Sequence, residues 1–347
     1  MEEILRNKNL EAILFFSPEN LRYLTGFSGG EGVLLVLRDR KVLMVDSRYF
    51  EEAREDASGC EIRLWEKGTK GIAAVLHDMG LHRVGLEAAG ISLATYYELA
   101  REAEGVEFVS LKAEVEALRA QKRPWEIELI RRAVELAERA FGEVLGMIRP
   151  GMKEIEVALE LEFRMRRMGS EGVAFDPIVA SGPRSALPHA RPSQRPIGKG
   201  EAVIVDFGGR YHGYCSDETV TLFAGDPPEE LKKVYQVVKE AHDRALEVIR
   251  PGVGCREVDQ AARSVIEEAG YGTYFGHGTG HGVGLAVHEY PSITKDSPSE
   301  LKEGMVLTVE PGIYLPGRGG VRIEDLVVVK EDGFELLTSL KKALRIL

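Results

Sequence analysis

The chain has 347 residues, enough for two domains, and its 44% hydrophobic and 29% charged content is ordinary for a globular protein with sizeable cores. Its formal net charge is -11, and an acidic surface repels phosphate backbones, so nucleic acid is excluded as the main partner. The three cysteines are widely spaced, which excludes a disulfide framework and a zinc ribbon. The acidic start lacks the positive residues of a signal peptide, and no apolar run is long enough to span a membrane. We therefore expect a cytoplasmic protein without a membrane partner.

The first third of the chain alternates between strand-like and helix-like patterns. Apolar runs predict strands at residues 10–17, 32–39, 41–47 and 83–89, and helical patterns fall around residues 69–80 and 92–104. This alternation indicates a small α/β domain.

A long amphipathic helix is predicted over residues 122–141, and Pro124 lies in a first turn that tolerates proline. The change of pattern near Gln121 predicts two domains, over residues 1–121 and 122–347. Charged residues on this helix, among them Glu126 and Arg132, are expected to be solvated.

The second domain contains an internal repeat. "MIRPGMKEIEVA" (147–158) echoes "VIRPGVGCREVD" (248–259), and each segment lies between two helical patterns. A β-hairpin follows each repeat, at residues 201–223 and 305–329. Because the order helix, turn, helix, hairpin occurs twice, we predict an α+β domain whose halves are related by an approximate two-fold axis.

Two aspartates lie on the arms of the first hairpin. If residues 212–213 form the tight turn, Asp206 faces Thr219, and Asp217 is its diagonal neighbour on the same face. The strand around Asp206 is apolar and should be buried, and a buried carboxylate without a partner is costly. A compensating cation is therefore expected near Asp206.

The second hairpin repeats this arrangement with Glu310 and Glu324, which are equidistant from Gly317. A two-fold axis would bring both hairpins to one centre, where four buried carboxylates cannot all ionise without cations. The pattern therefore favours a metal centre over solvated carboxylates.

Histidines are concentrated in "GHGTGHGVGLAVHE" (276–289). Oxygen ligands with one imidazole suit manganese, cobalt, iron or zinc, and five protein ligands exceed the needs of one tetrahedral ion. Two divalent ions that share carboxylates are therefore expected, and such a pair can activate water for attack on a carbonyl. A phosphate-binding loop is disfavoured because the stretch lacks the P-loop lysine.

Each of the five candidate ligands lies in a short local motif: "VDFGG" with Asp206, "CSDETVT" with Asp217, "TGHGVGL" with His281, "VEPGIY" with Glu310 and "VRIED" with Glu324. These motifs resemble the ligand set of the pita-bread metallopeptidases. The segments "NLRYLTGFSG" (20–29) and "VDSRYFEEA" (45–53) are similar to the creatinase/prolidase amino-terminal domain. The whole chain thus resembles the prolidase and aminopeptidase P branch, which implies a pita-bread catalytic domain preceded by a smaller α/β domain.

This resemblance implies hydrolysis of the bond between an amino-terminal residue and proline in short peptides, by a homodimer with two metal ions. It makes the five motif residues metal ligands, with Glu310 also moving the proton to the leaving nitrogen. The glycines beside His281 are expected to let the backbone approach the metals. The other implied site residues are His288, which stabilises the oxyanion, His189, which reaches in from a loop, and His277, in the substrate pocket or behind it.

Two further side chains are candidates for the substrate pocket. Tyr314 could pair with a bound carboxylate, and Arg322 could orient Glu324 or Asp206 through a charge-assisted hydrogen bond.

The chain departs from the family pattern at two positions. Val220 replaces an arginine, and Ser292 stands where archaeal-type prolidases often carry the arginine that grips the dipeptide carboxylate. A dipeptidase would then need another cation, such as Arg318 or Lys295, so the sequence slightly favours an aminopeptidase P that acts on longer peptides. A methionine-aminopeptidase-like exopeptidase and a non-enzymatic peptide-binding protein are the alternatives.

Overall fold

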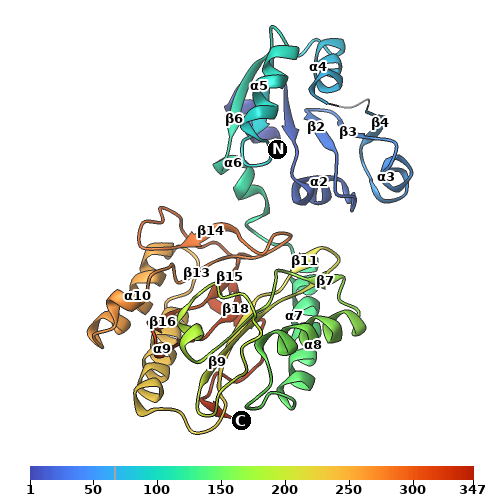
Figure 1. Ribbon diagram of the computed structural model, residues 1–347. Coiled ribbons are helices and arrows are strands. Elements are labelled where there is room, and N and C mark those ends of the chain that lie inside the picture. The colour runs from blue at the N-terminus through green and yellow to red at the C-terminus, as the bar shows by residue number, and fades with distance from the viewer. Residues whose placement is uncertain (66–67) are drawn as a thin grey trace. The chain divides into compact units, whose positions relative to one another are not determined.

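The computed structural model describes residues 1–65 and 68–347, which form two compact units, Met1–Arg119 and Ala120–Leu347. In the described part of the first unit, six strands form one sheet in the order β4-β3-β2-β1-β5-β6 (Figure 1). The strands are β1 (Ala12–Phe15), β2 (Val33–Leu37), β3 (Lys41–Val45), β4 (Glu61–Leu64), β5 (Arg83–Glu87) and β6 (Glu107–Leu111). The helices are α1 (Glu2–Asn7), α2 (Pro18–Thr25), α3 (Phe50–Asp56), α4 (Thr69–Asp78), α5 (Leu93–Glu102), α6 (Ala113–Glu116) and η1 (Ala117–Arg119).

The sequence of the central strand β1 is a continuous apolar run because both faces of the strand are buried. Successive side chains point to opposite faces, so Leu14 joins one buried cluster and Phe15 joins the other. Both side chains are fully buried, as expected for a strand covered on both faces. The edge strands β4 and β6 are largely exposed or half-buried. The sequence analysis did not predict them, because their residues are of mixed polarity.

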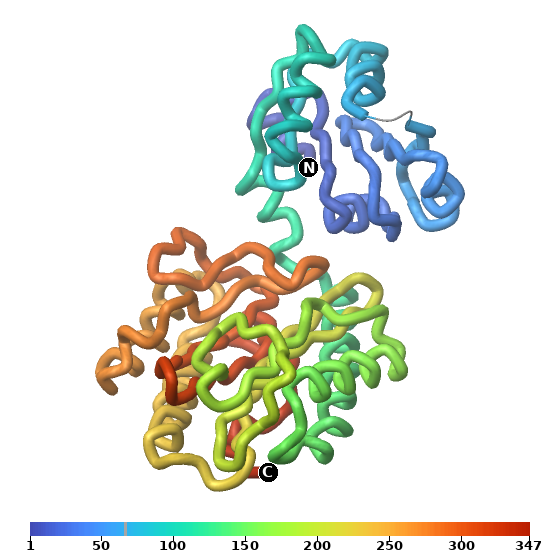
Figure 2. Tube along the Cα trace, in the orientation of Figure 1, coloured from blue at the N-terminus to red at the C-terminus, as the bar shows by residue number. Residues whose placement is uncertain are grey.

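The second unit contains two helix pairs. Helices α7 (Pro124–Leu145) and α8 (Glu154–Arg167) lie on one side of the strands, and α9 (Glu229–Glu247) and α10 (Cys255–Glu268) lie on the other (Figures 1 and 2). Each pair is followed by a hairpin, so the predicted duplication and the predicted fold class are confirmed. None of the helices in residues 1–65 and 68–347 combines the length and apolar character that a membrane span requires.

Apart from β20, which pairs with β12, strands of the two halves build separate sheets. Within the described second unit the sheet orders are β20-β12-β9-β8, β11-β10-β7, β14-β13-β15-β18-β19 and β16-β17. The first-half elements are β7 (Gly172–Val173), β8 (Ile178–Ser181), η2 (Gly182–Ala186), β9 (Ala202–Phe207), β10 (Gly209–Tyr211), β11 (Tyr214–Cys215) and β12 (Glu218–Phe223). The second-half elements are η3 (Gly272–Tyr274), β13 (Gly280–Gly282), β14 (Glu289–Ile293), β15 (Val306–Val309), β16 (Gly312–Leu315), β17 (Gly319–Arg322), β18 (Asp325–Lys330), β19 (Gly333–Leu336) and β20 (Arg345–Ile346).

The turn fixes the register of the first hairpin. His212 and Gly213 have φ values of 45° and 78°, as a tight hairpin turn requires, and Thr219 pairs with Asp206 as predicted. In the second hairpin Gly312 pairs with Arg322, so Glu310 and Glu324 are placed symmetrically about Gly317.

Each hairpin turns an apolar face to its own helix pair. Val205 and Phe207 join the cluster beneath α7 and α8, where the Phe207 ring stacks on Phe141 at 4.9 Å between centroids. Asp206 lies between them in the strand, so alternation directs its side chain away from this core. The carboxylate of Asp206 therefore lies on the face of the strand opposite this hydrophobic core.

Candidate metal centre

A cavity of about 490 Å³ opens in the second unit. Its wall includes all five predicted metal ligands, three further histidines and Arg322. The ligands come from five strand positions: Asp206 within β9, Asp217 just before β12, His281 within β13, Glu310 just after β15 and Glu324 just before β18. Two hairpins and one neighbouring strand thus bring together side chains that are up to 118 residues apart in sequence.

Three of these side chains lie close enough to share an ion. Asp217, His281 and Glu324 each offer one ligand atom, and these atoms lie within 4.8 Å of one another. His281 Nε2 is also 3.4 Å from Glu310 Oε1 and 3.6 Å from Asp217 Oδ2. The distances fit donor atoms that face a common centre.

Burial makes this concentration of negative charge costly. Burial, followed by the neighbouring carboxylates, raises the pKa of Asp217 and of Glu324 well above the ordinary values. Burial also raises the pKa of Glu310 to about 7. The buried Oδ1 atom of Asp206 has no hydrogen-bond partner within residues 1–65 and 68–347. These carboxylates fit divalent cations, which would compensate the charge and complete the coordination of the orphaned oxygen.

The imidazole of His281 is suited to the same task. Burial, followed by the nearby His288, lowers the pKa of His281 to about 4, so the ring is neutral at pH 7. A neutral imidazole has a free lone pair for a metal ion. The ring centroids of His281 and His288 are 4.1 Å apart, which places His288 directly beside the ligand group.

Arg322 is a buried partner of the carboxylates, 3% exposed. Its Nη2 donates to Asp206 Oδ2 at 2.6 Å, and its Nε donates to Thr219 Oγ1 at 3.1 Å. Thr219 Oγ1 donates in turn to Glu324 Oε2 at 2.7 Å. Arg322 therefore contacts Asp206 directly and reaches Glu324 through Thr219, so it is not a solvated strand arginine.

Tyr314 lies behind the cavity wall. It is absent from the described lining residues, and its hydroxyl contacts His277 Nε2 at 2.8 Å and Arg322 Nη1 at 3.1 Å. Burial raises the pKa of Tyr314 to about 12 and lowers that of His277 to about 4. The geometry makes Tyr314 a link between His277 and Arg322, while His277 itself lines the cavity together with His189.

The glycines beside His281 are required by neighbouring strands, because a Cβ on Gly280 would lie 2.0 Å from Thr308 O and one on Gly282 would lie 2.4 Å from Tyr290 O.

Two sequence-based expectations need correction. Glu126 is buried rather than solvated. Neither Arg318 nor Lys295 belongs to the described cavity wall, and Arg318 pairs with Glu230 instead.

Among the wall residues that the sequence analysis missed are Phe175, Asp176 and Arg191. Arg191 lies two positions after His189, and this proximity is the signal that could have identified it. Ser292 also lines the cavity, so the position with a missing arginine does face the site.

Comparison with known proteins identifies relatives along the whole chain. The sequence profile of metallopeptidase family M24 matches residues 128–331, and that of the creatinase/prolidase N-terminal domain matches residues 1–121. An Xaa-Pro dipeptidase of Pyrococcus horikoshii is 37% identical over 99% of this chain and 96% of the relative. The solved Xaa-Pro dipeptidase from Bacillus anthracis is 41% identical with a TM-score of 0.95, covering 100% of this chain and 98% of that one. The X-Pro aminopeptidase from Thermotoga maritima is 40% identical with a TM-score of 0.88, covering 98% of both chains.

Proposed function

The chain belongs to metallopeptidase family M24 and is a metallo-exopeptidase, and from this premise we propose that it cleaves the bond between an amino-terminal residue and proline in short peptides. Full-length similarity to Xaa-Pro dipeptidases and to an X-Pro aminopeptidase supports this substrate class. The creatinase/prolidase-type domain at residues 1–121 argues against a methionine-aminopeptidase-like enzyme. In this proposal, residues 122–347 form the catalytic domain of a homodimer.

We propose that Asp206, Asp217, His281, Glu310 and Glu324 hold two divalent ions. The observation that carries this proposal is the convergence of four carboxylates and a neutral imidazole on one cavity. The donor set suits manganese, cobalt or zinc. When bound, such ions polarise a carbonyl oxygen and lower the pKa of a water molecule.

The remaining chemistry falls to the protein's own side chains. We propose that His288, which lines the cavity, donates a hydrogen bond to the oxygen that gains negative charge as the carbonyl is attacked. We propose that Glu310 takes up a proton and passes it to the leaving nitrogen. The proline nitrogen carries no proton before cleavage, so it must receive one to leave as an amine.

Other residues bind or orient. Arg322 holds Asp206 in a fixed orientation, and Tyr314 holds Arg322 and His277 in place. We propose that His189 and His277, which both line the cavity, contact the substrate.

The direct test uses protein stripped of metal and reloaded with manganese, cobalt or zinc. Release of alanine from Ala-Pro or Ala-Pro-Gly-Gly, with little release from Ala-Ala, is the expected result. The variant Asp217→Asn should bind less metal and lose this activity in proportion. A reloaded protein with two ions per chain that cleaves neither proline peptide would overturn the proposed substrate class.

A further inference from the structure

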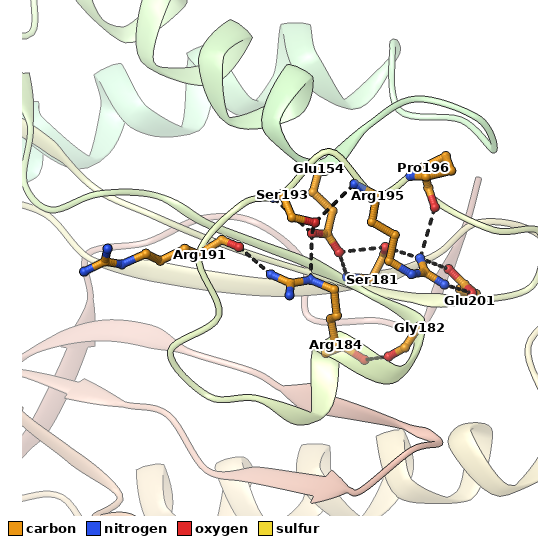
Figure 3. A network of polar contacts seen from close by, with 10 residues as sticks. Glu154, Ser181, Gly182, Arg184, Arg191, Ser193, Arg195, Pro196 and Glu201 are labelled. Atoms are coloured by element: carbon orange, nitrogen blue, oxygen red, sulfur yellow. Dashed lines mark hydrogen bonds and ion pairs between the residues drawn. The ribbon is translucent and has the colours of Figure 1, made fainter.

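The cavity wall carries two arginines in different surroundings. Arg322 is buried and held by Asp206, as described above. Arg191 is exposed, and no carboxylate within residues 1–65 and 68–347 pairs with its guanidinium. Figure 3 shows the Arg191 guanidinium extending away from the network around Glu154. Arg191 is therefore a cation of the wall that is available to a ligand.

The backbone of this loop is fixed although the side chain is free. Glu154 is fully buried and accepts hydrogen bonds from Ser181 N and Oγ at 2.8 and 2.9 Å, and from Ser193 Oγ at 2.7 Å. It also accepts from Arg184 Nε at 3.0 Å, and Arg184 Nη2 donates to the carbonyl oxygen of Arg191 (Figure 3). The backbone is thus held at the Arg191 carbonyl and at Ser193, and a ligand that pairs with Arg191 need not order this part of the loop.

The same wall also carries the carboxylates of the candidate metal centre. Asp206, Asp217, Glu310 and Glu324 all line the same cavity. A dipeptide that enters this cavity brings its free carboxylate close to the bond that breaks, and removing that carboxylate from water costs free energy unless a cation pairs with it. Ser292, which is neutral, cannot supply that cation. Arginine can, because its planar fork matches a carboxylate with two parallel hydrogen bonds.

We propose that Arg191 binds the terminal carboxylate of an Xaa-Pro dipeptide and so favours dipeptides over longer peptides. This inference rests on the proposed function. It reverses the preference for longer peptides that Ser292 suggested, because the sequence did not reveal a second cation on the wall. Arg191 acts as a specificity-determining residue that touches the substrate at its carboxyl end, away from the bond that breaks.

The test compares Arg191→Gln and Arg191→Lys with the unchanged protein on Ala-Pro and on Ala-Pro-amide. Arg191→Gln should raise KM for Ala-Pro by about 10- to 100-fold, the range for losing a charged hydrogen-bond pair, with little change in kcat. Its kinetics on the amide should stay within about twofold, since the amide has no carboxylate to lose. The KM of Arg191→Lys for Ala-Pro should lie between those of the unchanged protein and Arg191→Gln, because lysine keeps the charge but loses the paired geometry.

Arg318→Gln is the matched control, since it removes an exposed arginine that lies outside the described cavity wall. It should leave both substrates unchanged. Equal losses on Ala-Pro and its amide, or no loss on either, would overturn the role of Arg191.

Failure of the proposed function gives a different result, because the unchanged protein would then cleave neither substrate. In that case calorimetric titration of the metal-loaded protein with Ala-Pro and Ala-Pro-amide decides the inference independently. An Arg191-dependent preference for the free carboxylate supports it, and equal affinity for the two peptides overturns it.

Discussion

Adjacent residues on two strands show two ways of accommodating buried negative charge. Asp217 and Glu218 are neighbours at the start of β12, and Glu324 and Asp325 are neighbours at the start of β18. Because side chains alternate along a strand, the first residue of each pair lines the cavity and the second faces the opposite side, toward Lys342. The same strands therefore carry a cavity-side pair of carboxylates and a rear pair.

The rear pair has its cation built into the chain. Lys342 is 9% exposed, and its Nζ contacts Glu218 Oε1 and lies 3.3 Å from Asp325 Oδ1. Burial would lower the pKa of Lys342, but Glu218 and Asp325 raise it, so the lysine is charged. Asp325 also accepts a hydrogen bond from Thr338 Oγ1 at 2.6 Å and lies 3.1 Å from His242 Nε2.

The cavity-side pair shares Arg322 with two more carboxylates, so the described wall carries more negative than positive charge. A carboxylate with a cation in the chain is structural, whereas an excess of carboxylates at one point requires ions from solution. This contrast gives four predictions, from the largest effect to the smallest.

Removing a cavity-side carboxylate should abolish activity without weakening the fold. In Glu324→Gln we expect metal binding to be lost and kcat/KM to fall by at least about 10⁴-fold, because metal assistance contributes several kcal/mol. The metal-free variant should unfold at the same or higher urea concentration than the metal-free parent, since an uncompensated charge is gone. Metal analysis, peptide kinetics and urea unfolding measure the three quantities.

The control for this experiment is the neighbouring residue on the rear face. Asp325→Asn should keep both its metal and most of its activity. Full metal content and activity within tenfold of the parent in Glu324→Gln would contradict the assignment of this carboxylate to the metal centre.

Removing the rear cation should have the opposite effect. Lys342→Met leaves Glu218 and Asp325 buried without their lysine, and breaking a buried pair in this way costs about 3–5 kcal/mol of unfolding free energy. The folded variant should retain its bound metal and its kcat/KM. Combining Lys342→Met with Glu218→Gln should recover part of the loss.

Lys330→Met is the matched control because Lys330 pairs with Glu335 at 3.1 Å and both side chains are exposed. Its expected cost is below about 1 kcal/mol. If Lys342→Met is no more costly than Lys330→Met, the rear pair is not held by the lysine.

These two faces also differ in how far the sequence reveals them. The cavity side could be predicted, because the turn at His212 and Gly213 fixes a period-two register and the internal repeat places a second hairpin beside the first. The rear face could not. Lys342 lies in a segment with no periodic pattern, and its partner Glu218 is 124 residues away.

The same limit applies to Glu126. Its place in the first turn of a long helix is typical of a solvated residue, but it accepts a hydrogen bond from Tyr214, which is 88 residues away in sequence. The sequence thus predicts contacts that follow from local period and symmetry, whereas contacts between segments without such a pattern emerge only in the folded chain.

Without metal, Glu310 on the cavity side and Asp325 on the rear face should respond to pH with opposite signs. The pKa of Glu310 is raised to about 7 from 4.5, so its contribution to stability is full below pH 4.5 and is lost as pH rises through 7. We expect metal-free protein to lose about 3 kcal/mol of unfolding free energy between pH 5 and pH 8 from this group. Asp325 acts in the other direction. Although burial raises its pKa, His242 and Lys342 lower it below the ordinary value, so its contribution is lost as pH falls.

Urea unfolding of stripped protein across this range measures the dependence, and Glu310→Gln should reduce it by the share that Glu310 contributes. Adding metal should restore stability at pH 8 more than at pH 5, because bound cations favour the ionised carboxylates. A stripped protein that becomes more stable from pH 5 to pH 8 would contradict the sign assigned to the cavity-side carboxylates.

Glu126 provides the mildest case, a buried carboxylate held by neutral donors. It is 1% exposed, and it accepts hydrogen bonds from Tyr214 Oη at 2.8 Å and from the backbone N–H of Arg123 at 3.0 Å. Tyr214→Phe removes one donor and keeps the ring, so we expect a loss of about 1 kcal/mol of unfolding free energy. Metal content and kcat/KM should not change, and Tyr97→Phe, at a ring that is 64% exposed, should have almost no effect. If Tyr214→Phe instead costs as much unfolding free energy as Lys342→Met, the hydrogen bond from Tyr214 stabilises Glu126 as strongly as a buried cation would. That result would contradict the distinction between hydrogen-bonded and ion-paired carboxylates in this fold.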